Sequence, residues 1–205
     1  SGFKVPALSL GTATFGGGNE FFRAWGSTDV AEAKRLIDIA LDAGCTMVDS
    51  ADAYSGGLAE EILGKAMRGR RYRFIVATKI GWVGFDAEHN RSQYDTVAKL
   101  IAGVDESLRR LQTDHLDLIQ CHIFCPEPNT PIFLEGFQKM KRDGKVRAFG
   151  VSTSDLAHLQ TFNADGDCDA LQVDYSILNR TPEADMLPYC LANDIGVIVR
   201  GPLAM

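Results

Sequence analysis

Along its whole length the chain alternates short apolar runs with amphipathic helical patterns. Seven runs rich in Val, Ile and Leu are predicted to be strands, at 8–12, 46–50, 74–79, 116–122, 148–152, 170–175 and 197–200. Amphipathic periodicity predicts six helices between them, at 30–41, 58–67, 96–111, 131–142, 155–162 and 182–193. Because a helix separates each pair of successive strands, we expect the strands to be parallel.

Parallel strands joined by helices form either an open doubly wound sheet or a closed barrel. An open sheet that binds a dinucleotide has a Gly-x-Gly-x-x-Gly turn after its first strand, and the stretch from Gly11 to Gly18 does not form one. We therefore predict an α/β fold, a (β/α)8 TIM barrel. A complete barrel usually needs about 250 residues. Since only seven strands are visible, we expect a single barrel domain over 1–205 that is truncated after its seventh strand, its C-terminal strand and helix missing.

Composition argues against several classes of partner. The net charge is −6 and basic residues are scattered among acids, so nucleic acid is an unexpected partner. No apolar stretch approaches the ~20 residues that cross a bilayer, which predicts no membrane insertion. Three of the five cysteines, Cys45, Cys121 and Cys190, sit inside apolar runs. This pattern is typical of reduced, buried thiols and favours a cytoplasmic protein.

A metal site is not expected. The Cys121-His122 pair with Cys125 has the right residue types, but a zinc site needs three or four ligands at compatible spacing. No second cluster of Cys and His exists elsewhere in the sequence.

Four ionisable side chains lie at or just after the ends of successive predicted strands: Asp49, Tyr54, Lys79 and His122. In a parallel barrel these positions meet at one rim, where barrel enzymes carry their chemistry. A lysine beside a phenol stabilises the phenolate, an aspartate keeps that lysine charged, and a histidine can orient a carbonyl oxygen. Such a set can move a proton but lacks a nucleophile or a metal, so a nicotinamide hydride is the natural second reactant.

Five stretches of the chain resemble the aldo-keto reductase superfamily, in its bacterial-type branch. The first, Asp-Ser-Ala-Asp-Ala-Tyr, is similar to the family's Asp-Thr-Ala-x-x-Tyr signature, and the others resemble the helix that follows it, the lysine strand, the approach to the catalytic histidine and the approach to the fifth strand. They lie at 49–54, 60–64, 77–79, 108–118 and 141–152.

The resemblance implies an NAD(P)H-dependent reductase of small-molecule aldehydes or ketones. Tyr54 would be the general acid, Lys79 and Asp49 its tuning pair, and His122 the residue that orients the substrate. It implies NADP(H) as cofactor, with NAD(H) as the alternative. The implied cofactor contacts are Thr12, Asp49, Ser152, Gln172, Arg200, Gly201, Pro202 and Leu203.

Aromatic residues are frequent in the loops that would face the barrel mouth. Loop residues on a rigid scaffold often line a substrate pocket. We therefore expect Trp25, Trp82 and Phe124 to contribute to an apolar pocket.

Two other functions remain open. A barrel aldolase could use Lys79 to form a Schiff base, but this needs a neutral amine, and Asp49 argues against it. A non-catalytic relative could serve as a cofactor-sensing subunit of a membrane assembly, as some members of the superfamily do. Those members tend to have Asn where this chain has His122.

Overall fold

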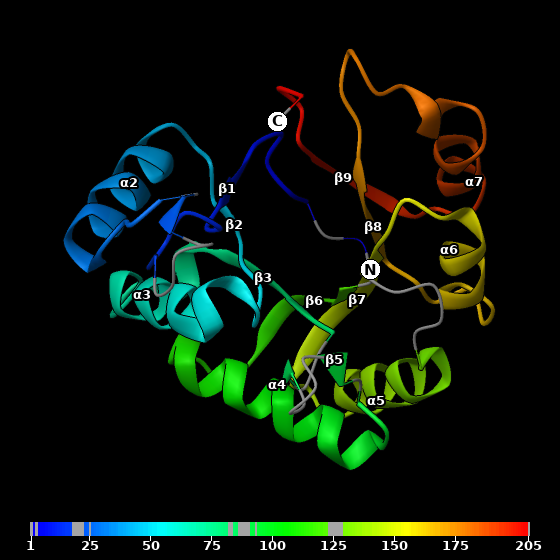
Figure 1. Cartoon of the computed structure of the whole chain (residues 1–205), viewed down its shortest axis with the longest axis horizontal. Helices are drawn as coiled ribbons and strands as arrows, with labels where there is room; N and C mark the ends of the chain where they lie inside the picture. The colour runs from blue at the N-terminus through cyan, green and yellow to red at the C-terminus, as the bar shows by residue number, and fades with distance from the viewer. Residues whose placement is uncertain are drawn as a thin grey trace.

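Seven parallel strands form one curled sheet at the centre of the molecule (Figure 1). The computed structural model describes residues 2, 4–17, 23–24, 26–81, 84–85, 91–92, 94–122 and 129–204. In sheet order the strands are β1 (Ser9–Gly11), β2 (Met47–Asp49), β3 (Ile75–Ile80), β6 (Leu116–His122), β7 (Val146–Ser152), β8 (Ala170–Asp174) and β9 (Gly196–Arg200). The fold is therefore an α/β barrel that stops after its seventh strand, as predicted.

Helices cover the outside of the curled sheet (Figure 1). They are α2 (Val30–Asp42), α3 (Leu58–Ala66), α4 (Val97–Leu111), α5 (Thr130–Arg142), α6 (Leu156–Phe162) and α7 (Met186–Ala192). The Asp29 side chain accepts a hydrogen bond from the Glu32 N–H at 2.9 Å and caps the start of α2. Thr96 caps the start of α4 in the same way. In each cap, a side-chain oxygen satisfies an N–H that the first turn leaves unpaired.

The structure differs from the expected elements in two places. The segment 182–193 is not one helix: a 3-10 turn, η3 (Thr181–Glu183), precedes α7. Pro188 explains where α7 begins, since proline fits the first turn of a helix but disrupts an interior position. A two-stranded antiparallel pair, β4 (Gly84–Phe85) with β5 (Arg91–Ser92), was not predicted. Its strands have two residues each, too few to show an alternating pattern.

Alternation along the strands separates two apolar clusters. Inside the curl, Met47, Ala77 and Leu118 pack with Ala148 and Ala170. Between strands and helices, a larger cluster contains the residues of opposite parity, such as Val48, Val76, Ile119, Val151 and Leu171. Since side chains in a strand alternate between faces, the residues two positions after the inner cluster also point inward. This parity places Asp49, Lys79 and Gln172 on the inner face. It also places Ser152 and His122 there, four positions after Ala148 and Leu118.

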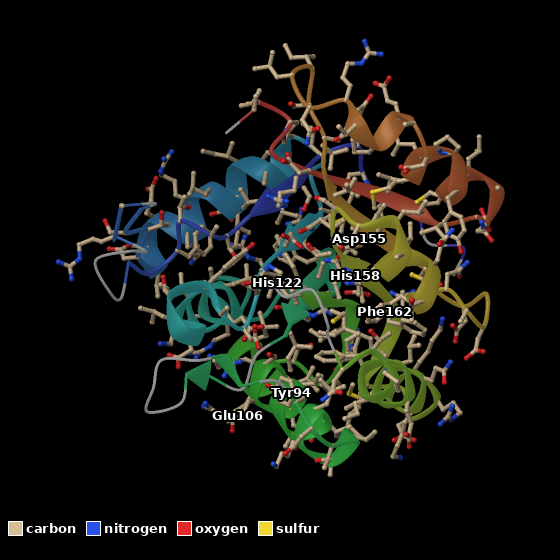
Figure 2. All side chains as sticks on the ribbon, turned by 45° about the vertical axis from the view of Figure 1, so that its right-hand side comes forward. Tyr94, Glu106, His122, Asp155, His158 and Phe162 are labelled. Atoms are coloured by element: carbon tan, nitrogen blue, oxygen red, sulfur yellow. The ribbon has the colours of Figure 1, made fainter. Side chains whose placement is uncertain are left out.

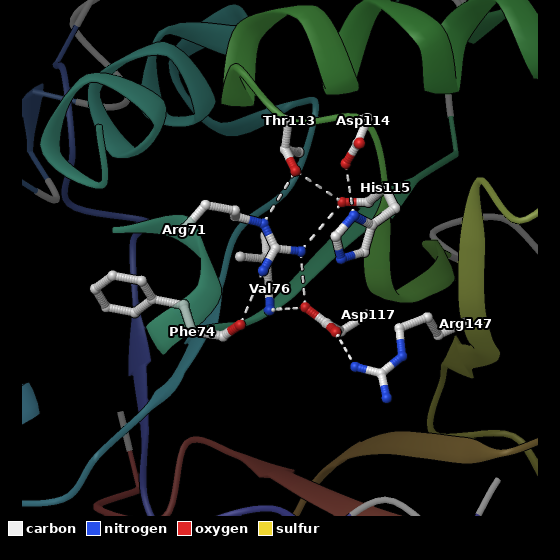
Figure 3. Close-up of polar contacts among 8 residues, drawn as sticks. All are labelled: Arg71, Phe74, Val76, Thr113, Asp114, His115, Asp117 and Arg147. Atoms are coloured by element: carbon white, nitrogen blue, oxygen red, sulfur yellow. Dashed lines mark hydrogen bonds and ion pairs between the residues drawn. The ribbon is translucent and has the colours of Figure 1, made fainter. Parts of the chain in front are cut away.

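At the amino-terminal end of the strands, the Asp117 side chain on β6 accepts hydrogen bonds from η2 (Arg71–Arg73), β3 and β7 (Figure 3). Its Oδ2 accepts from the Val76 N–H at 2.9 Å and from the Arg71 guanidinium at 2.7 Å. Its Oδ1 accepts from Arg147 at 2.7 Å. Arg71 also donates to the Phe74 carbonyl at 2.8 Å. A cleft of about 490 Å³ lies beside these groups. Residues at this end of a barrel typically serve stability, whereas the chemistry lies at the opposite end.

None of the helices in the described part of the chain is both long and apolar enough to cross a bilayer.

Candidate active site

Three of the predicted catalytic residues lie on the inner face at the carboxyl ends of their strands. Asp49 ends β2, and Lys79 lies next to the end of β3. His122, labelled in Figure 2, ends β6. Tyr54 begins η1 (Tyr54–Gly57), the turn that follows β2. All four therefore belong to one rim of the curled sheet.

Lys79 is the centre of this group. Its side chain is fully buried, and its Nζ lies 2.7 Å from Asp49 Oδ2. The same Nζ donates to the Ser50 carbonyl at 2.6 Å and lies 5.0 Å from the centroid of the Tyr54 ring. Burial alone would lower the pKa of Lys79, but the charges and hydrogen bonds of Asp49 and Tyr54 outweigh it and raise that pKa. The ammonium is therefore charged at neutral pH.

Tyr54 faces His122 as well as Lys79. The two rings meet edge to face, with centroids 6.2 Å apart and an interplanar angle of 86°. His122 is 8% exposed, so its ring is shielded from bulk water. The Tyr54 ring thus lies near both an ammonium and an imidazole.

The backbone of the Tyr54 turn has an unusual conformation. Ser55 (φ 51°), Gly56 (φ 64°) and Gly57 (φ 93°) are all left-handed. Ser55 Oγ donates to the Phe15 carbonyl at 3.0 Å and accepts from the Gly17 N–H at 3.1 Å. These bonds hold a non-glycine residue in a conformation that costs energy, a feature that clusters at functional sites.

Among the expected cofactor contacts, Thr12, Ser152 and Gln172 are buried near the same rim. Gln172 Nε2 donates to Asp49 Oδ1 at 3.2 Å, and Thr12 Oγ1 lies 2.9 Å from Ser50 Oγ. Ser152 is the register partner of both His122 and Gln172. Hydroxyl and amide groups at this point fit a planar carboxamide, which needs both donors and acceptors.

The remaining cofactor candidates lie at the end of β9 and in the turn after it. Arg200 ends this strand, and the turn after it is closed by a bond from the Ala204 N–H to the Gly201 carbonyl at 2.9 Å. Pro202 lies in this turn, and Leu203 is 78% exposed. Since β9 is parallel to β8, the turn emerges at the same rim as Gln172.

The three predicted pocket residues, Trp25, Trp82 and Phe124, lie outside the described residues. Phe15, another aromatic residue near the predicted barrel mouth, is 1% exposed and belongs to the main apolar cluster. Within the described ranges, no group of three or more His, Cys, Asp and Glu side chains is arranged to hold a metal ion.

Sequence reasoning missed a buried polar cluster behind Lys79. Glu60, on α3, is 0% exposed and accepts from Thr78 Oγ1 at 2.6 Å and from Arg110 Nε at 2.7 Å. Arg110 also donates to Ser107 Oγ at 3.1 Å. The adjacency of Thr78 to Lys79 is a weak signal for this cluster, because only tertiary structure brings α3 and α4 against that strand.

The comparison with protein families agrees with this geometry. The family model described as "Aldo/keto reductase family" matches residues 7–205. The aldo-keto reductase YhdN of Bacillus subtilis (strain 168) is 36% identical over 99% of this chain and 60% of its own length. The NADH-specific methylglyoxal reductase of Escherichia coli (strain K12) is 32% identical over 97% of this chain and 64% of its own length.

Solved structures are also similar. The holo form of the aldo-keto reductase AKR11C1 from Bacillus halodurans has a TM-score of 0.84 and 32% identity, over 98% of this chain and 63% of that one. An aldo-keto reductase from Klebsiella pneumoniae in complex with NADPH has a TM-score of 0.78 and 28% identity, over 98% of this chain and 65% of that one. The chain thus spans about 60% of the length of the curated relative YhdN. With a family model that matches nearly all of it, this chain belongs to the aldo/keto reductase family.

Proposed function

We propose that this protein reduces the carbonyl group of small-molecule aldehydes or ketones to an alcohol, with Tyr54 as the general acid. The observation that carries the proposal is the buried Lys79–Asp49 pair, 2.7 Å apart, with the Tyr54 ring 5.0 Å from the same ammonium. An oxidoreductase is supported by the family to which the chain belongs.

We propose NADP(H) as the cofactor, with NAD(H) as the alternative. A similar structure was solved with NADPH, whereas a similar Escherichia coli enzyme is named as specific for NADH. We propose that Ser152 and Gln172 hold the carboxamide of a nicotinamide and that Arg200 to Leu203 contact the rest of the molecule; the buried positions of Ser152 and Gln172 at this rim support the first assignment. A bound, reduced nicotinamide would supply a hydride to the carbonyl carbon.

The side chains of this protein handle the proton. His122 orients the carbonyl oxygen toward Tyr54, and Tyr54 donates its phenolic proton to that oxygen as the oxygen gains negative charge. The Lys79 ammonium stabilises the phenolate that remains. At a separation of ~4 Å and an effective dielectric of ~20, such a contact is worth about 4 kcal/mol. Asp49 keeps the ammonium charged in its dry environment, which the raised pKa of Lys79 reflects.

Two competing functions make different predictions. A Schiff-base aldolase needs a neutral Lys79, and the Asp49 carboxylate 2.7 Å away opposes this. A cofactor-sensing subunit has some support, because a probable voltage-gated potassium channel subunit beta of Arabidopsis thaliana is 33% identical to this chain. His122 and the intact Tyr54–Lys79–Asp49 group favour turnover.

The test is steady-state oxidation of NADPH, and separately of NADH, with sugars, aromatic aldehydes, ketones and 2-oxoaldehydes. We expect Tyr54→Phe to lower kcat by about 10²-fold or more, with cofactor binding unchanged in a fluorescence titration. Tyr72→Phe is the matched control, because Tyr72 is 85% exposed. Equal turnover by Tyr54→Phe and wild type would refute the assignment. A single slow oxidation of bound cofactor without a steady state would favour the cofactor-sensing subunit. Trapping of a covalent Lys79 adduct by borohydride would favour the aldolase.

A further inference from the structure

Asp52 lies between the strand that carries Lys79 and the turn that carries Tyr54. Its N–H donates to the Lys79 carbonyl at 3.0 Å, and the Tyr54 N–H donates to the carbonyl of the preceding Ala51 at 3.1 Å. The backbone at Asp52 is therefore bonded to β3 two residues before Tyr54. A change at this side chain acts directly on the start of the Tyr54 turn.

Charged groups on three elements act on the Asp52 carboxyl group. They are Glu60 on α3, Arg110 on α4 and Lys79 on β3, and the phenol of Tyr94, which precedes α4, is coupled to the same cluster. The two cations already have partners: Arg110 Nε lies 2.7 Å from Glu60 Oε2, and Lys79 Nζ lies 2.7 Å from Asp49 Oδ2. Among the described residues, Asp52 is thus the one carboxyl group of this cluster that has no ion-pair partner.

The immediate surroundings of Asp52 also disfavour a charge. Its Oδ1 is enclosed and has no hydrogen-bond partner among the described residues. A buried carboxylate oxygen without a donor is costly, whereas a neutral carboxyl group is much less so. Burial, and next the negative charge of Glu60, raise the pKa of Asp52 to about 8, although Arg110, the Ala53 N–H and Lys79 act in the opposite direction. Asp52 is accordingly neutral for the most part at pH 7.

We propose that Asp52 is a positioning residue for Tyr54: its enclosed, neutral carboxyl group holds the turn in place, and its ionisation releases the turn. This proposal rests on the proposed function for its effect on turnover. The protonation of Asp52 and its effect on stability do not depend on that function.

The turn is built so that such a release reaches Tyr54. After Tyr54 come three consecutive left-handed residues, Ser55, Gly56 and Gly57. Gly57 packs so closely on Arg110 that an added Cβ would lie 2.9 Å from Arg110 Cδ. An ionised Asp52 would draw the guanidinium away from Glu60, or draw water toward its own oxygen, and either change disturbs the surface on which the turn rests. Tyr54 then loses its position beside Lys79, so kcat falls while cofactor affinity does not.

The central variant is Asp52→Asn, which has the shape of the neutral acid and cannot ionise. Asp42→Asn is the matched control, because Asp42 is an exposed residue at the end of α2. Three measurements on the purified proteins suffice: the carbonyl stretch of a protonated carboxylic acid in infrared spectra taken across the alkaline range, the denaturation midpoint as a function of pH, and kcat against pH with the cofactor dissociation constant measured alongside.

For the infrared measurement we expect the wild type to show a protonated carboxyl band that disappears near pH 8, and Asp52→Asn to lack that band. In the unfolded chain an aspartate ionises near pH ~4, and in the folded protein Asp52 ionises near pH 8. Between these values the unfolded chain releases a proton that the folded protein retains, so this group costs stability progressively as pH rises. The denaturation midpoint of Asp52→Asn should therefore rise relative to wild type from about pH 4 to about pH 8 and keep that difference above.

For turnover we expect Asp52→Asn to stay within about threefold of wild type at neutral pH and to keep its kcat into more alkaline solution, while Asp42→Asn follows the wild type. Glu60→Gln should have the opposite effect: it removes the charge that opposes ionisation of Asp52, so the fall in kcat moves to lower pH. The cofactor dissociation constant should not follow either change.

The proposal is overturned if wild type shows no titrating carboxyl band, if Asp52→Asn and wild type lose kcat over the same pH range, or if Asp52→Asn does not fold. If the wild type reduces no carbonyl compound at all, the proposed function fails. The infrared and denaturation results then still decide whether Asp52 is neutral.

Discussion

The amide of Gln172 is oriented by Asp49: Gln172 Nε2 donates to Asp49 Oδ1 at 3.2 Å, across 123 positions in the chain. The other oxygen of the same carboxylate accepts from Lys79 Nζ at 2.7 Å. One side chain therefore connects Lys79, which we propose tunes the proton donor, with a residue that we expect to hold the nicotinamide. Because the Gln172 amide has a defined direction, its oxygen is available as an acceptor on the other side.

Gln172→Leu should weaken cofactor binding about tenfold, because one polar contact to the carboxamide and its orientation by Asp49 are lost. Fluorescence titration with NADPH measures this directly. Gln160→Leu, at an exposed position of α6, is the control for a Gln-to-Leu change. Equal affinities of Gln172→Leu and wild type would show that Gln172 does not contact the cofactor.

Lys79→Met should destabilise the fold by about 3 kcal/mol or more, because the substitution leaves the Asp49 charge without its partner. Adding Asp49→Asn should recover part of this loss. Denaturant unfolding of the two single variants and the double variant gives the coupling energy of the pair. Strictly additive effects would contradict a direct Lys79–Asp49 interaction.

Gly57→Ala should reduce both stability and kcat, and Gly56→Ala is its matched control. Both residues have left-handed φ values, but an added Cβ meets nothing within 4 Å at Gly56 and lies 2.9 Å from Arg110 Cδ at Gly57. We expect about 1 kcal/mol of lost stability at Gly56, from the conformational cost alone, and at least twice that at Gly57. A kcat that falls equally in both variants would argue against the Arg110 contact as a support for Tyr54.

Asp117→Asn should flatten the loss of stability in acid. Burial opposes a charge on Asp117, but the Val76 N–H and the Arg71 and Arg147 guanidinium groups outweigh it and lower the pKa of Asp117. An acid with a depressed pKa contributes stability above its unfolded value of ~4, and that contribution is lost as pH falls through its folded pKa. We therefore expect wild type to lose stability more steeply than Asp117→Asn below about pH 4 in thermal unfolding. Parallel curves for the two proteins would contradict the network in Figure 3.

The element pattern was readable from the chain because burial leaves a local periodicity. The strand 116–122 was predicted with the bounds that the structure has. The same parity that buries Leu118 also turns His122 inward. Since parallel strands end at one rim, the meeting of Asp49, Lys79 and His122 follows from the alternation of strands and helices.

Contacts between distant segments were decided by the tertiary structure. Nothing near Asp52 or Glu60 in sequence indicates that Arg110, from a helix about 50 positions later, pairs with Glu60 and leaves Asp52 without a cation. The same holds for Gln172 and Asp49, which meet only once β2 and β8 curl toward one another. Periodicity records whether a side chain is buried, but the identity of its partner depends on the register and curvature of strands far apart in the chain, and so does the pKa that the partner sets.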